Sequence, residues 1–214
     1  MCGYFERPNI SLQDASESPR MGRPDLTEKR TAEILDSFER CVGKFGLEGS
    51  SLEHIAEEAG MKRSILRHYV GNRDDLVVAL TKRVVSKYRL GLDEFASSIR
   101  PAKRVDDLIQ YLLPSSRQSS SESILVIESL IAGAEQYEEV RVQMLSYIDD
   151  VVDMITSQLR LEFPKRTKAE CWTVAYGMVC IWFNQESLGP LGLPPKYLKS
   201  ARSGMRSLID TLGK

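Results

Sequence analysis

Two short helical patterns on either side of Gly60 constrain this chain more than any other feature. The first pattern has its apolar stripe at Leu52, Ile55, Ala56 and Ala59. The second resumes within two residues and has its apolar side at Leu66, Tyr69 and Val70. Gly60 supplies the positive φ that a tight turn needs, and the small Ala56 lets the two helices cross closely. The spacing predicts a helix-turn-helix, although an ordinary corner between two core helices has the same pattern.

A longer helix is expected before this pair. Its apolar residues recur at helical spacing at Ile34, Phe38, Val42 and Phe45. We expect Thr27 to cap its N-terminus and Gly46 to end it. Ser50 or Ser51 should cap the following helix, with Glu53 closing a capping box from Ser50.

Charge is segregated along the same stretch. Glu57 and Glu58 end the first short helix, and the next carboxylate in the sequence is Asp74. Four cations lie in the interval: Lys62, Arg63, Arg67 and Arg73. The whole chain has a formal net charge of −1, so an affinity for nucleic acid has to come from a local patch such as this one. A helix in the major groove of DNA needs hydrogen-bond donors and no carboxylates on the face that enters the groove. The alternative explanation of these cations is an ordinary charged surface in contact with water.

Residues 22–80 resemble the N-terminal DNA-binding domain of the TetR family of bacterial transcriptional regulators. The shared elements run in order through Ile34-Leu35, Phe45-Gly46, Ser50-Ser51, Ile55-Ala56, Ala59-Gly60, Leu66 and the stretch HYVGNRDDL from His68. The chain departs from the common family pattern at residues 64–67, and Val70 replaces a common Phe. These departures affect the expected base preference more than the fold.

The helix-turn-helix supplies the candidate DNA contacts. We expect Arg63 and Arg67 to read bases, because Arg side chains can bind guanine O6 and N7 in bidentate fashion. Ser64 and His68 project from the same helix. The family resemblance implies phosphate contacts, which fix register without reading sequence, at Ser51, Lys62, Tyr69 and Arg73.

The rest of the chain predicts a helical body, so the expected fold is all-α. Helical patterns cover residues 74–95, 101–114, 123–133, 140–159, 167–188 and 195–212. Ser119 with Glu122, and Thr167 with Glu170, have the spacing of capping boxes. The expected organisation is a disordered arm at residues 1–20, a helix-turn-helix DNA-binding domain at residues 21–73, and a ligand-binding and dimerisation domain at residues 74–214.

The last two patterns suggest an interface between two copies of the chain. Residues 167–188 are apolar on all sides, which predicts burial on all sides, and residues 195–212 carry one continuous apolar stripe. Two such helices from each of two chains would form a four-helix interface, and the family resemblance also implies a homodimer. Val179 and Met205 are the positions expected at that interface, with a purely internal core as the alternative.

The resemblance further implies a small-molecule effector that binds inside the C-terminal helices. Seven residues are candidates for the pocket lining: Tyr111, Glu128, Met144, Tyr147, Trp172, Tyr176 and Phe183. Glu128 is the expected polar determinant, and the aromatic content suggests a flat, mainly apolar effector of unknown identity. Each candidate has an ordinary alternative as a core residue, because aromatic stripes at helical spacing also fill helical bundles.

Several functions find no support in the sequence. The four cysteines and two histidines are too widely spaced for a metal site or a His-dependent triad, and no Gly-rich phosphate loop is present. No signal peptide or membrane span is visible, so we expect a cytoplasmic protein without a cofactor, a metal or a membrane partner. The leading hypothesis is a homodimeric repressor, not an enzyme, that leaves a near-palindromic double-stranded DNA operator when an effector binds. The alternatives are an effector-free architectural DNA-binding protein and, more distantly, a helical enzyme or carrier.

Overall fold

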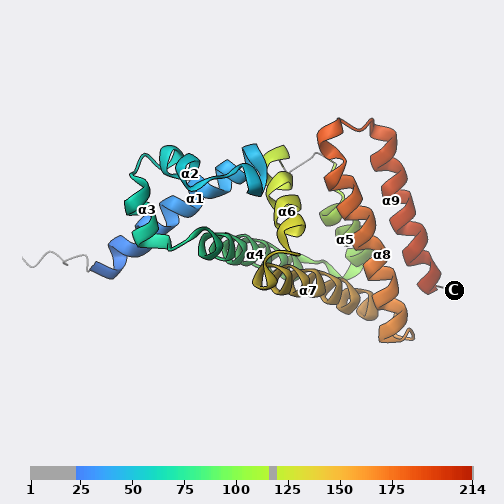
Figure 1. Cartoon of the computed structure of the whole chain (residues 1–214). Coiled ribbons are helices and arrows are strands. Elements are labelled where there is room, and N and C mark those ends of the chain that lie inside the picture. The colour runs from blue at the N-terminus through green and yellow to red at the C-terminus, as the bar shows by residue number, and fades with distance from the viewer. Residues whose placement is uncertain (1–22, 116–119, 214) are drawn as a thin grey trace, which may run out of the picture.

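The computed structural model describes residues 23–115 and 120–213. Within these ranges every regular element is a helix, which confirms the expected all-α class. Figure 1 shows a head of three helices, α1 to α3, joined through a long helix to a body formed by the remaining ones. The predicted disordered arm at residues 1–20 and the predicted cap Ser119 lie outside the described residues.

The helices follow the predicted patterns closely. They are α1 (Arg23–Gly49), α2 (Leu52–Glu58), α3 (Arg63–Val70), α4 (Arg73–Ser98), α5 (Arg104–Leu112), α6 (Ser121–Gly133), α7 (Glu138–Glu162), α8 (Lys168–Ser187) and α9 (Pro195–Asp210). Short 3-10 helices lie at Pro101–Lys103, Gly189–Leu191 and Thr211–Gly213. The connecting helix α4 packs against the long helix α7 of the body (Figure 1).

The first helix begins earlier than expected. It starts at Arg23, so Thr27 lies inside the helix and the prediction of an N-cap at Thr27 is wrong. Pro24 explains the earlier start, because proline suits the first turn, where its missing amide hydrogen would have no helical partner. Gly46 breaks the helix as expected, since its φ of 70° lies outside the helical region.

The cap of α2 is one of the two predicted serines, but the predicted capping box does not form. Ser51 is the N-cap, and its hydroxyl accepts a hydrogen bond of 3.2 Å from the amide of His54. The Ser50 hydroxyl instead donates to the carbonyl oxygen of Gly46 over 2.7 Å. The predicted capping box from Ser50 is therefore wrong, because Ser50 is used to close the kink that precedes it.

The helix-turn-helix is confirmed. Ile55 and Ala56 of α2 and Leu66 of α3 are buried against α1. Gly60 sits in the turn between α2 and α3 with a φ of 61°, as predicted from its position in the sequence. A small apolar core thus fixes α3 relative to the other two helices and leaves its opposite face exposed.

The long helix α4 starts from a well-formed cap. The Asn72 side chain accepts from the Asp75 amide over 2.9 Å, and the Asp75 carboxylate accepts from the Asn72 amide over 3.0 Å. This reciprocal pair satisfies two amides at the end of the helix. From there α4 runs out of the head and into the body (Figure 1).

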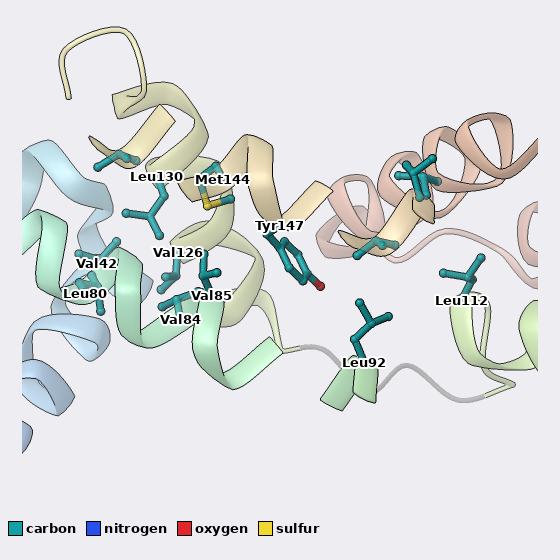
Figure 2. Packing of buried hydrophobic residues seen from close by; sticks show 14 of the residues in the cluster. Val42, Leu80, Val84, Val85, Leu92, Leu112, Val126, Leu130, Met144 and Tyr147 are labelled. Carbon is teal, nitrogen blue, oxygen red and sulfur yellow. The ribbon is translucent and has the colours of Figure 1, made fainter. Parts of the chain in front are cut away.

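A single hydrophobic core connects the head to the body. Figure 2 shows part of it, with Val42, Leu80, Val84, Val85, Leu92, Leu112, Val126, Leu130, Met144 and Tyr147 labelled. The helix with the closest link to the head is α6, which packs along α1. A change in the position of α6 would therefore directly alter its packing against α1.

The caps of the later helices agree with the sequence at one position and differ at another. Thr167 and Glu170 form the predicted capping box at the start of α8. The cap of α6 is Ser120, whose hydroxyl accepts from the Ser123 amide over 3.1 Å, so the prediction of Ser119 is wrong by one residue. The serine run at residues 119–121 offers the same side chain at each position, which is why the spacing alone could not distinguish them.

In the single chain α8 keeps one face exposed, and the prediction of burial on all sides requires a partner chain to cover that face. Trp172 and Tyr176 are 41% and 48% exposed. Val179 and Met205, which were expected at an interface between chains, are instead buried in the core of this chain. The outward face of α8 therefore lies elsewhere on the helix than the sequence suggested.

Candidate functional site

The exposed face of α3 carries the side chains that were predicted to contact DNA. Arg63, Ser64, Arg67 and His68 are all exposed, and Leu66 on the opposite side is fully buried. Residues three and four apart share one face of a helix, so these four side chains form a single surface. Figure 1 shows α3 at the opposite end of the molecule from α8 and α9.

Arg63 is not a free cation on this surface. Its guanidinium pairs with the carboxylate of Glu53 on α2, and the two side chains are 54% and 59% exposed. Arg63 has no carboxylate among its close neighbours in the sequence. In the folded chain, however, the carboxylate of Glu53 lies beside it. An exposed pair of this kind contributes little to stability, so the arginine can exchange Glu53 for another anion at small cost.

The carboxylate of Glu58 is turned away from α3. It accepts a hydrogen bond of 2.7 Å from Arg40 of α1 and pairs with Lys44 over 3.4 Å. The hydrogen bond from Arg40 lowers the pKa of Glu58, with a further contribution from Lys44. These ion pairs hold α2 against α1. Because they also engage the Glu58 carboxylate, this acidic residue does not cancel the positive charge on the exposed face of α3.

Two of the predicted phosphate contacts, Lys62 and Tyr69, lie at the start of α3 and within it, and a third, Ser51, lies at the start of α2. Lys62 is exposed and directly precedes the helix. Tyr69 is half-buried, and its ring meets that of His68 edge to face with 5.3 Å between centroids. Ser51 is half-buried, and its hydroxyl is occupied as the cap of α2.

Arg73, the fourth predicted phosphate contact, is engaged within the chain. It donates to the hydroxyl of Tyr137 over 2.8 Å and to the carbonyl oxygen of Leu47 over 2.6 Å. Its guanidinium also lies 3.6 Å from the Glu48 carboxylate. Tyr137 precedes α7 and Leu47 follows the kink in α1, so Arg73 ties the head to the body.

A pocket opens between α4, α6, α7 and α8. Its empty volume is about 610 Å³, which includes space open to solvent. Its lining consists of Tyr88, Ser123, Ile124, Ile127, Glu128, Ile131, Met144, Tyr147, Ile148, Trp182, Phe183, Glu186 and Ser187. The walls are thus mainly apolar and aromatic, with two carboxylates, which is the usual composition of a small-molecule site.

The structure brings four of the seven predicted pocket residues together, and these are Glu128, Met144, Tyr147 and Phe183. The other three lie elsewhere. Tyr111 stacks on Phe95 with 3.7 Å between ring centroids. Trp172 and Tyr176 stack on each other at 5.4 Å on the exposed face of α8, so their assignment to the pocket is wrong.

Sequence reasoning missed Tyr88, Trp182 and Glu186 as pocket residues. Glu186 had a signal that could have been used, because it is the first charged residue after Glu170 and every residue between the two is uncharged. Burial raises the pKa of Tyr88, with nearby Glu39 and Glu186 acting in the same direction. Burial also raises the pKa of Tyr147, so both phenol groups are neutral at physiological pH.

Two other classes of site were searched for in the described part of the chain. No cluster of three or more His, Cys, Asp or Glu residues there could hold a metal ion. No described helix combines the length and apolar character that crossing a membrane requires.

Proteins of similar sequence are transcriptional regulators. No family model matches this chain. It is 29% identical over 96 residues to the HTH-type transcriptional regulator PksA of Bacillus subtilis (strain 168), a match covering 44% of this chain and 47% of that protein. It is 27% identical over 127 residues to the HTH-type transcriptional regulator RutR of Escherichia coli O157:H7, covering 59% of this chain and 58% of that protein. The chain thus spans about half the length of these curated relatives.

Solved structures share most of the architecture. A TetR transcription regulator from Haloarcula marismortui ATCC 43049 superposes with a TM-score of 0.72 at 16% identity, covering 86% of this chain and 98% of that one. The chain therefore has the fold of a helix-turn-helix transcriptional regulator, a class of proteins that are not enzymes. Within that class its fold is the one found in the TetR family, which confirms the resemblance seen in residues 22–80.

Proposed function

We propose that this protein is a homodimeric transcriptional repressor that binds a near-palindromic DNA operator through α3 and leaves it when a small molecule enters the body pocket. The observation that carries the proposal is the exposed face of α3, where Arg63, Ser64, Arg67 and His68 lie together. Donors on one face of a short helix, anchored from behind by Leu66, suit the major groove of DNA.

Within this proposal the residues have different roles. Arg63 and Arg67 contact base edges, with Ser64 and His68 beside them. Lys62, Tyr69 and the amide end of α2 at Ser51 contact phosphates and fix the register. Arg73 instead acts as a link between head and body, which its bonds to Leu47 and Tyr137 support.

The proposed homodimer forms through α8 and α9. Support comes from the exposed aromatic pair Trp172 and Tyr176 on α8, since large apolar side chains on a surface favour an interface. A groove between the two helices continues this face, lined by Cys180, Ile181, Asn184, Gln185, Tyr197, Ser200, Ala201 and Gly204. The small residues of α9 would let a partner helix approach closely, as in a four-helix interface.

The proposed switch runs through α6. This helix contributes Ile127, Glu128 and Ile131 to the pocket, and it packs along α1 in the head. The contact is tight at Gly133, where an added Cβ would lie 2.9 Å from the Leu47 side chain. A ligand that displaces α6 would thus move α1 and change the spacing of the two α3 helices of a dimer. Half-sites one turn apart require about 34–36 Å between those helices, so small shifts weaken binding.

Selection of bound fragments from the genome of the source organism tests the proposed function. The purified protein is incubated with fragmented genomic DNA at physiological salt, and the bound fraction is sequenced. A regulator enriches a few fragments that share a near-palindromic motif. An architectural protein retains fragments without preference, and an enzyme or carrier retains none, so either outcome would refute the proposal.

A further inference from the structure

We propose that the body pocket binds an organic cation, held by Glu186 and Glu128 and enclosed by aromatic rings. The inference names the class of effector for the switch proposed above and therefore rests on that function. Its basis is the chemistry of the pocket wall between α4, α6, α7 and α8. It replaces the sequence expectation of a flat, mainly apolar effector.

The aromatic part of the wall suits a cation. Four rings line the pocket: Tyr88, Tyr147, Trp182 and Phe183. The faces of such rings attract ammonium groups, and the attraction is greater where water is excluded. A quaternary or alkylated ammonium group also presents apolar surface, so it fits the apolar wall supplied by α6 and α7.

Glu186 places a carboxylate oxygen without a described partner in the pocket wall. Its Oε2 atom is buried and has no hydrogen-bond partner among the described residues. A buried carboxylate oxygen without a partner is costly, and such groups in folded proteins call for an explanation. The described residues that line the pocket include no Lys, Arg or His, so none of these residues supplies a cation there. A cationic ligand would supply the opposite charge that this carboxylate lacks.

Glu128 places a second carboxylate on another wall. It lies on α6 and is half-buried, whereas Glu186 lies on α8. Two carboxylates in one pocket repel an anionic ligand, and a neutral ligand leaves their negative charge unbalanced. A cation between them would attract α6 and α8 toward the same point. Since α6 also packs on α1, occupancy of this site by a cation would act on the helix that leads to the head.

Calorimetric titration with matched compounds tests the proposal on the full chain. The cations are tetramethylammonium, tetraethylammonium and benzyltrimethylammonium, each paired with the neutral compound in which carbon replaces nitrogen, and phenylacetate serves as the anion. We expect at least one cation to bind about tenfold more tightly than its neutral pair, with no binding of the anion. The absence of binding by all three cations, or equal binding by the neutral compounds, would overturn the proposal.

Variants locate the effect. Glu186→Gln keeps the shape of the side chain and removes its charge, so it should weaken cation binding about tenfold and leave the neutral compounds unaffected. Glu128→Gln should act in the same direction. Glu135→Gln, at an exposed position just after α6, is the matched control and should change nothing. Equal cation affinity in Glu186→Gln and the wild-type protein would show that the carboxylate is not the partner.

An operator titration separates this inference from the proposed function. If a cation binds the pocket and operator affinity does not change, the cation site stands and the proposed switch fails. If a neutral or anionic compound binds the pocket and releases the operator, the switch stands and the cation proposal fails.

Discussion

Arg63 and Arg67 share one face of α3 but differ in electrostatic setting. Arg63 is paired with Glu53, whereas Arg67 forms no ion pair with any described residue. In the proposed complex Arg63 would exchange the Glu53 carboxylate for DNA, so part of its gain on binding would be offset. Arg67 has no such competitor, and we expect it to contribute more to the choice of sequence.

Replacing Arg67 with Ala should cost about 1–3 kcal/mol in binding to the preferred duplex and much less in binding to random DNA. Arg63→Ala should also weaken binding to the preferred duplex more than binding to random DNA, but the loss of binding free energy should be smaller than for Arg67→Ala. Anisotropy titrations on both duplexes measure these differences. Arg160→Ala, at an exposed position on α7, serves as the control. If Arg67→Ala weakens both duplexes alike, this residue contacts phosphate and does not read bases.

A second residue-scale prediction concerns the bond between Arg73 and Tyr137. Tyr137→Phe removes only the hydroxyl that accepts from Arg73, so the free energy of unfolding should fall by about 1–3 kcal/mol. Arg73→Ala should cost more, because the Leu47 carbonyl then also loses its donor. Urea denaturation measures both effects. Unchanged stability in Arg73→Ala, together with an equal loss of affinity for all duplexes, would restore the phosphate role expected from sequence.

Among the elements, α8 shows best where sequence analysis succeeds and where it cannot. Its limits and its Thr167 cap followed from local chemistry that the sequence contains in full. Which face of α8 is buried could not be predicted in the same way, because a helix that is apolar on all sides has no single apolar stripe to mark its buried face. Trp172 and Tyr176 proved to lie outside, while Trp182 and Glu186 line the pocket. Their placement depends on the packing of α6 and α7, which no local pattern encodes.

The outward face of α8 gives the prediction at this scale. Tyr176→Asp places a charge at a position 48% exposed in one chain, so the chain should fold while the proposed dimer dissociates. Sedimentation should show a monomer, and operator affinity should fall because two half-sites are no longer bound together. Leu161→Asp, at a position 64% exposed on α7, is the control. A dimer that persists in Tyr176→Asp would place the interface elsewhere.

The whole molecule is a head and a body joined by α4, by the α1–α6 contact and by Arg73. The head could be anticipated from sequence because its turn, small residues and charges lie within one short stretch. The joint could not, since it brings Leu47, Arg73 and Tyr137 together from distant parts of the chain. The proposed coupling between pocket and DNA therefore depends on contacts that form only in the assembled fold.

The most direct test of a dimer that reads DNA through α3 is a comparison of three duplexes by anisotropy titration. One carries a selected near-palindromic site, one has a single half-site scrambled, and one has both scrambled. The proposal predicts affinity for the intact site at least about 10³-fold above the fully scrambled duplex, with most of this preference lost when one half-site is scrambled. Equal affinity for all three duplexes would contradict sequence-specific binding by a symmetric dimer.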